Sequence, residues 1–153
     1  MALTTFSGPV KSLNGVVVLG AVDITADTTL NANAHAGRVI RVNDADGVIT
    51  LPSITSDNIG ATYHIYIETA ATSVVIKTDG VDKYTGGVYI GVNNATGKTF
   101  ISAASNDVMT LNGTTSGGLA GSVIKMTAIT TAKYDVSSVV LGSGSLITPF
   151  SDA

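Results

Sequence analysis

The stretch from Gly91 to Thr99 comes nearest to phosphate chemistry, because its Gly91, Gly97, Lys98 and Thr99 stand in an order similar to a phosphate-binding loop. That loop needs four residues between its glycines so that backbone N–H groups surround the phosphates, whereas five residues separate this pair. The segment also lies between two predicted strands and lacks the helix whose N-terminus would bind the anion. It therefore predicts a hairpin loop.

The aspartates Asp44 and Asp46, followed by Gly47, resemble the start of a calcium-binding loop. An EF-hand loop requires a third oxygen ligand before its glycine and a bidentate Glu six residues after it. Ser53 stands at that later position, and no helices are predicted on either side. We interpret the segment as a structural turn.

The remaining polar residues do not form a recognisable catalytic set. The two histidines, His35 and His64, lack a second histidine at metal-site spacing, and we expect His64 to face solvent or a subunit boundary. No serine occupies a GxSxG turn, and most of the 11 acidic residues are turn aspartates, which normally cap their own backbone. We therefore expect no catalytic residues, metal or cofactor, and a protein that is not an enzyme.

The composition narrows the function classes further. Hydrophobic residues make up 44% of the 153 residues, while charged residues make up only 12% and aromatic residues 5%. A surface with so few charges loses its water readily and suits a subunit that packs against others. The net charge of −3 and the scattered basic residues argue against a nucleic-acid partner. No apolar run approaches the roughly 18 residues of a membrane span, and no cysteine is present.

Short apolar runs, rich in β-branched residues and separated by turn residues, predict many short strands. The clearest alternation places Tyr63, Ile65 and Ile67 on one face of a strand. Only 32–36 and 102–107 suggest a helical turn. We expect an all-β fold, an antiparallel β-sandwich or barrel of jelly-roll type. The predicted strands are residues 15–22, 28–30, 38–43, 48–51, 62–68, 73–78, 87–92, 99–102, 108–112, 123–128 and 133–141.

Turn residues and composition also predict how the chain is divided. The segment 44–47 reads as a tight hairpin, and Asp79-Gly80 and Asn112-Gly113 as two further sites of this kind. Residues 1–14 contain Pro9 and have no periodicity, which predicts an extended N-terminal arm. Residues 15–141 are the expected β-domain. The Gly/Ser-rich stretch after residue 141 predicts a flexible hinge and tail over 142–153.

Five stretches, taken in chain order, match short motifs that occur together in one kind of protein. They are residues 6–15, 37–52, 60–67, 106–118 and 148–151. As a set they resemble small structural proteins encoded by tailed bacteriophages. The opening departs from the family pattern at one position, because Val16 stands where the pattern has Phe.

The resemblance implies a virion protein that decorates the outside of the major capsid protein shell and stabilises it, made in the host cytoplasm and located on the capsid surface. It also implies a homotrimer seated at threefold positions of the shell. We expect the arm to lie across capsid subunits, with apolar contacts to the capsid or to sister subunits. The expected contact residues are Phe6, Pro9, Val10, Pro149 and Phe150. The alternative is a tail fibre, spike or adhesin module that binds host surface glycans.

Overall fold

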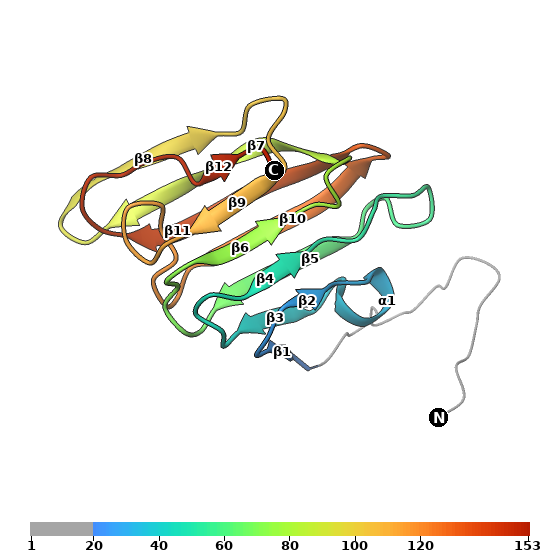
Figure 1. The fold of residues 1–153 in the computed structure, drawn as a ribbon, viewed down its shortest axis with the longest axis horizontal. Helices are drawn as coiled ribbons and strands as arrows, with labels where there is room; N and C mark the ends of the chain where they lie inside the picture. The colour runs from blue at the N-terminus through green and yellow to red at the C-terminus, as the bar shows by residue number, and fades with distance from the viewer. Residues whose placement is uncertain (1–19) are drawn as a thin grey trace, which may run out of the picture.

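The computed structural model describes residues 20–153, which form two β-sheets packed face to face (Figure 1). The large sheet has seven strands in the order β1-β3-β5-β10-β11-β7-β8. The small sheet has five strands in the order β12-β9-β6-β4-β2. The predicted all-β sandwich is confirmed.

Between residues 38 and 142 the strand bounds follow the predicted runs closely, except that two strands begin four residues earlier than predicted, at Lys83 and at Ala95. The large sheet contains β1 (Val22–Ile24), β3 (Val39–Val42), β5 (Thr62–Ile67), β7 (Lys83–Val92), β8 (Ala95–Ile101), β10 (Val123–Thr130) and β11 (Lys133–Gly142). The small sheet contains β2 (Thr28–Thr29), β4 (Val48–Thr50), β6 (Val74–Lys77), β9 (Val108–Leu111) and β12 (Phe150–Ser151). One helical turn, α1 (Ala32–His35), begins where it was expected, with the Asn31 side chain accepting from the Ala34 N–H.

The sheets are mixed in direction, whereas antiparallel pairing was expected. From β1 to β6 the chain alternates between the sheets, so that β1, β3 and β5 pair in parallel, as do β2, β4 and β6. Each parallel neighbour is reached by crossing to the other sheet and back, which supplies the long connection that parallel strands need. Antiparallel pairing joins β5 to β10 and β6 to β9.

The turn at Asp44–Gly47 is not a hairpin, because β3 and β4 belong to different sheets. It carries the chain across the sandwich. The Asp44 carboxylate accepts the Asp46 N–H, and the carbonyl of Ala45 accepts the N–H groups of Thr72 and Ser73 from the next crossing. The hairpin predictions at Asp79-Gly80 and Asn112-Gly113 fail in the same way, since each joins one sheet to the other. Turn chemistry fixes a reversal of the chain but does not decide which strands pair.

Two true hairpins lie in the large sheet. The predicted hairpin within 91–99 is confirmed, with Asn93 and Asn94 between β7 and β8 and Asn94 in the left-handed region at φ 55°. The second joins β10 to β11. The helical turn suggested for 102–107 does not form, because that segment contains only turn and irregular backbone between β8 and β9.

The core lies between the sheets and follows the alternation of the strands. Tyr63, Ile65 and Ile67 on β5 are fully buried, as their alternation predicted. The Tyr63 and Tyr134 rings meet edge to face at 6.4 Å between centroids. The inner faces of both sheets are otherwise filled mainly by Ile, Val, Leu and Met.

The C-terminal residues belong to the folded domain, in contrast to the flexible tail expected for 142–153. Leu146 and Phe150 are 7% and 6% exposed, and the Phe150 ring packs edge to face on Tyr84 at 6.2 Å. Strand β12 pairs with β9 at the edge of the small sheet. Two buried side chains thus hold the end of the chain to the core, although a Gly/Ser stretch precedes them.

The predicted arm 1–14 and most of the predicted strand 15–22 lie outside the described residues; the described part of that strand contributes to β1. Within 20–153, no helix has the length and apolar character needed to cross a membrane.

Candidate functional site

The outer face of the large sheet carries an exposed row of apolar side chains. Strand register places Val123 on β10 beside Val139 on β11, and Val139 beside Tyr89 on β7. Their exposed fractions are 42%, 55% and 45%. Leu141 follows on β11 and is also exposed. We call Val123, Val139, Tyr89 and Leu141 the apolar row. Exposed large apolar groups gathered at one place are typical of an interaction surface.

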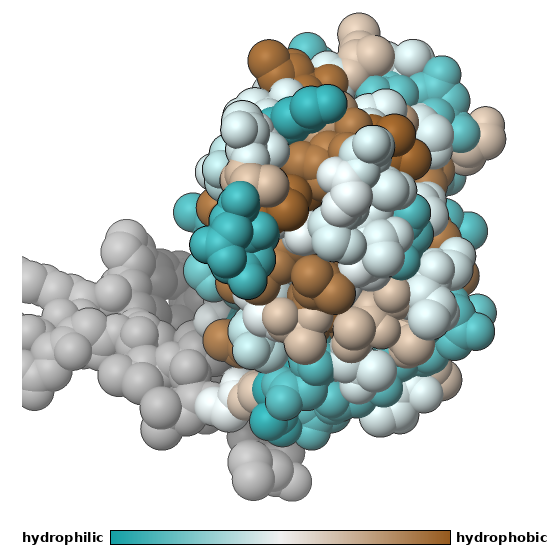
Figure 2. All heavy atoms as spheres, turned by 90° about the vertical axis from the view of Figure 1, so that its left-hand side faces the viewer, coloured by the Kyte–Doolittle hydropathy of each residue, from teal (hydrophilic) through white to brown (hydrophobic). Residues whose placement is uncertain are grey.

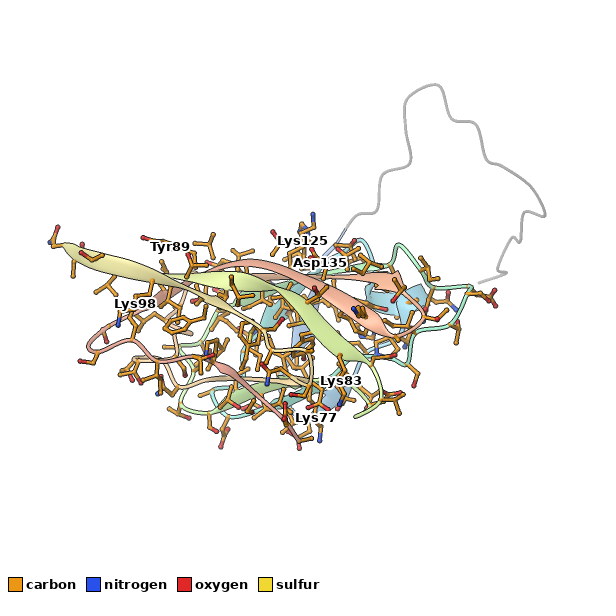
Figure 3. All side chains as sticks on the ribbon, turned by 90° about the horizontal axis from the view of Figure 1, so that it is seen from above. Lys77, Lys83, Tyr89, Lys98, Lys125 and Asp135 are labelled. Carbon is orange, nitrogen blue, oxygen red and sulfur yellow. The ribbon has the colours of Figure 1, made fainter. Side chains whose placement is uncertain are left out.

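Glycines hold the Tyr89 ring down on the sheet. The ring lies beside Gly91 of its own strand, and a Cβ at Gly97 on β8 would collide with the Tyr89 hydroxyl. One ring face therefore covers glycine backbone while the side chain remains half exposed on the outer side of the sheet (Figure 3). An aromatic ring laid over cross-strand glycines is a recognised way of covering exposed sheet backbone. The Tyr89 ring also presents a flat apolar surface, and because its side chain is already held in place, binding costs it little conformational entropy.

Few charges surround the apolar row. Lys125 on β10 lies opposite His64 on β5. Asp135 on β11 lies opposite Thr127, two residues beyond Lys125 on β10 (Figure 3). At the far edge, the Arg41 guanidinium donates to both carboxylate oxygens of Asp23, at 2.7 and 2.9 Å. This bond and the negative charge of Asp23 raise the pKa of Arg41 above its ordinary value. A partner can therefore cover the outer face of β10, β11 and β7 while removing water from few charged groups.

A shallow hollow of about 350 Å³ opens at the end of the sandwich next to the apolar row. It is lined by Val92, Asn93, Leu119, Leu141 and glycine backbone. Figure 2 looks onto this end, where hydrophobic residues gather in the middle of the view. The lining contains no ionisable side chain, so the hollow offers shape and apolar contact but no acid, base or nucleophile.

Two nearby carboxylates on the 79–82 turn show opposite pKa shifts, a pattern that catalytic acid–base pairs also show. The Ser53 hydroxyl donates to Asp79 at 2.5 Å, which holds the pKa of Asp79 below its ordinary value. Burial raises the pKa of Asp82, which accepts the Ile54 N–H at 2.8 Å. Asp79 also accepts the N–H groups of Val81 and Asp82. These bonds tie the turn to the segment after β4, and Asp82 is 3% exposed, which gives the pair a structural role.

A second polar contact fixes the C-terminus. The Lys83 ammonium donates to Asp107 at 2.5 Å and to the Gly80 carbonyl at 2.9 Å. Asp107 is buried and also accepts the Ala153 N–H, while its own N–H donates to Ser151. The bond from Lys83 is the main cause that lowers the pKa of the Asp107 carboxyl. The contact links the start of β7 in the large sheet to β12 and β9 in the small one.

The sequence-predicted residues fall in different places. His64 is exposed on the outer face, as expected, whereas His35 is buried and its Nδ1 lies 3.1 Å from the Asn31 N–H. Pro149 and Phe150 are both buried, so the structure does not leave them as surface contacts for a partner. The other predicted contact residues, Phe6, Pro9 and Val10, lie outside the described residues. Within 20–153, no three His, Asp or Glu side chains are grouped as a metal site requires.

Sequence reasoning did not identify the apolar row. One signal was present. Val123 shares its strand face with Lys125 and Thr127, so a large apolar residue lies on the face of the strand that is otherwise polar.

Comparison with protein-family models, curated proteins and solved structures finds no match to this chain.

Proposed function

We propose that this chain is a bacteriophage virion structural protein that decorates the outside of the major capsid protein shell and stabilises it. Two findings support the proposal: the ordered set of phage-protein motifs in the sequence, and the apolar row on a sheet face with few charges. The apolar row is the observation that carries it, because a decoration protein must present a surface that desolvates cheaply.

In this proposal the outer face of the large sheet contacts the shell, and residues 1–14 add an extended segment that lies across capsid subunits. Pro149 and Phe150 no longer belong to the contact set, because the fold buries them. Each contact is modest in area, but many copies on one shell resist its expansion together. The homotrimer stays a prediction that the resemblance implies.

A co-sedimentation assay with shells stripped of the protein tests this proposal. Val139→Lys places a charge in the middle of the apolar row, where a 55% exposed side chain leaves room for it. We expect shell binding to weaken by about tenfold or more, as for the centre of an interface. Thr29→Lys adds the same charge at an exposed position of the small sheet and serves as the matched control. Equal binding by both variants, or absence of the protein from purified virus particles, contradicts the proposal.

Tyr89 supports a second candidate function, a tail fibre or spike module that binds host surface glycans, because a flat exposed ring is a common sugar platform. Of the five tyrosines, Tyr63, Tyr84 and Tyr134 are buried, which leaves Tyr89 as the most exposed ring. Gold-labelled antibody on intact particles separates the two functions by labelling head or tail. Loss of glycan-array binding in Tyr89→Ala, together with tail labelling, favours the second.

A further inference from the structure

Strand β8 is the one long open edge among the described residues. It has seven residues, whereas the strands at the other three sheet edges, β1, β2 and β12, have three, two and two. Figure 1 shows β8 at the border of the large sheet. An open edge with unpaired N–H and C=O groups binds further strands, and proteins normally keep such edges short. The length of β8 therefore requires an explanation.

The backbone groups that β8 leaves free follow from its register with β7. Ser102 donates to the Gly86 carbonyl, and the same register pairs Phe100 with Val88 and Lys98 with Ile90. Hydrogen-bonded pairs alternate along an antiparallel ladder, so Lys98 and Phe100 of β8 and the following Ser102 direct their N–H and C=O groups toward β7. Thr99 and Ile101, which lie between them, direct theirs away from the sheet. The register shifts beyond Lys98, so Gly97 stands where the regular ladder ends.

The side chains of β8 match a second copy of the same strand. An antiparallel partner centred on Thr99 pairs Thr99 with its own copy and Ile101 with Gly97. Ile101 is 78% exposed, and the glycine opposite has no side chain to oppose it. The Thr pair is a favourable cross-strand combination. The same register sets Lys98 opposite Phe100, so that the two lysines do not face each other.

We propose that two copies of this chain associate through β8, antiparallel and about a twofold axis at Thr99, to join their large sheets into one continuous sheet. Thr99 and Ile101, the outward-facing residues of the regular part of each strand, then both take part in hydrogen bonds between the copies. Shifting the axis to Gly97 or Ile101 leaves outward groups of β8 unpaired. An isologous contact of this kind uses one surface patch on both copies.

The proposal stands apart from capsid decoration and has consequences for it. The two outer faces become neighbours in one sheet, which brings the two apolar rows onto the same side and doubles the surface offered to a partner. The twofold pair differs from the homotrimer that the sequence resemblance implies. Molar mass in solution distinguishes the two arrangements.

The first measurement is light scattering coupled to size exclusion on the full chain, over a protein series up to about 1 mM, because a contact limited to one edge is small and weak. We expect a shift from 15.4 kDa toward twice that mass as concentration rises. Amide hydrogen exchange by NMR on the same samples gives the second readout. The amides of Thr99 and Ile101 become protected with concentration, while those of exposed turn residues do not.

Thr99→Pro tests the axis itself. The Thr99 N–H points away from β7, so proline removes the two symmetric bonds at the axis without breaking the ladder inside the sheet. We expect dimerisation to weaken by about 30-fold or more, since each lost hydrogen bond costs several-fold. Thr99→Val keeps the N–H and the β-branched shape and is the matched control. A thermal scan of both variants verifies that each still folds.

Three results overturn the proposal: a monomer throughout the concentration series, a trimer without protection of the β8 amides, or a Thr99→Pro variant that dimerises as the unchanged chain does. None of these bears on shell binding. Failure of the shell assay with an intact dimer likewise leaves the twofold contact standing.

Discussion

The Tyr63 hydroxyl is buried, with 0% of the residue exposed, and has no hydrogen-bond partner within residues 20–153. Burial alone raises its pKa above the ordinary value. An unsatisfied buried hydroxyl costs about 1–3 kcal/mol of desolvation, and Tyr63→Phe removes that cost while keeping the ring against Tyr134. Subtracting a little packing lost with the oxygen, we expect the free energy of unfolding to rise by about 1 kcal/mol.

Two other buried tyrosines provide matched controls. The Tyr134 hydroxyl donates to the Pro52 carbonyl at 2.6 Å, and the Tyr84 hydroxyl donates to the Ile76 carbonyl at 2.9 Å. Their Phe variants lose a bond and leave a buried carbonyl less satisfied, so each should lower stability by about 1–2 kcal/mol.

Urea unfolding of all three variants, with midpoints compared at a common m-value, shows directly whether each substitution raises or lowers the free energy of unfolding. For a chain of this size, 1 kcal/mol corresponds to about 3 °C in Tm. The test depends on the opposite signs: Tyr63→Phe raises stability while the other two lower it. If Tyr63→Phe lowers the midpoint as much as Tyr134→Phe does, its hydroxyl has a partner and the reasoning is refuted.

Two further predictions concern the contact that holds the C-terminus and the N-terminal residues 1–14. Because the pKa of Asp107 is lowered in the folded state, its contact with Lys83 stabilises the protein above the unfolded carboxyl pKa of about 4, and this stability is lost as the pH falls through the folded value. Asp107→Asn should cost about 1–2 kcal/mol at pH 7, and this cost should shrink as the pH is lowered below about 4, by urea midpoints over a pH series; a cost that does not change with pH contradicts the ion pair. Deleting residues 1–14 should leave the far-ultraviolet circular dichroism spectrum and Tm nearly unchanged but abolish co-sedimentation with shells. Full shell occupancy by the shortened chain would argue against a binding role for the arm.

The sequence predicted strands well where burial alternates with every residue. On β5, Tyr63, Ile65 and Ile67 are buried while His64 is exposed, as the pattern indicated. On β10, Ile124 and Met126 are buried in the same way. In these segments a period of two can be satisfied by a strand alone, so local sequence is sufficient.

The pairing of those strands could not be predicted in the same way. Asp44–Gly47 has the residue types of a hairpin turn, yet its backbone hydrogen bonds join it to Thr72 and Ser73, which lie far along the chain. The parallel order β1-β3-β5 depends on contacts between successive crossings, and those contacts are not encoded in any single turn. The C-terminal error has a related cause, because the Gly142–Ser145 composition indicates a linker while the burial of Phe150 depends on Tyr84.

The apolar row escaped prediction because its members lie on three different strands. Val123, Val139 and Tyr89 are far apart in the sequence and become neighbours only through the β10-β11-β7 order of the sheet. Each of them alone is an ordinary exposed apolar residue and needs no explanation. Their register turns three ordinary residues into a surface.

The low charge of the chain has its effect at this surface. Most protein faces cannot be buried cheaply, because each Lys or Glu must keep its water or find a partner. Across the central strands of the outer face the charges include Lys125, Asp135 and Lys133, and all three lie to one side of the apolar row. Replacing charged residues by Thr, Ser and Gly keeps the chain hydrated through groups that cost little to cover. A partner that contacts the row therefore gains apolar burial with few charges to compensate, which is the condition that adhesion through many weak, identical contacts requires.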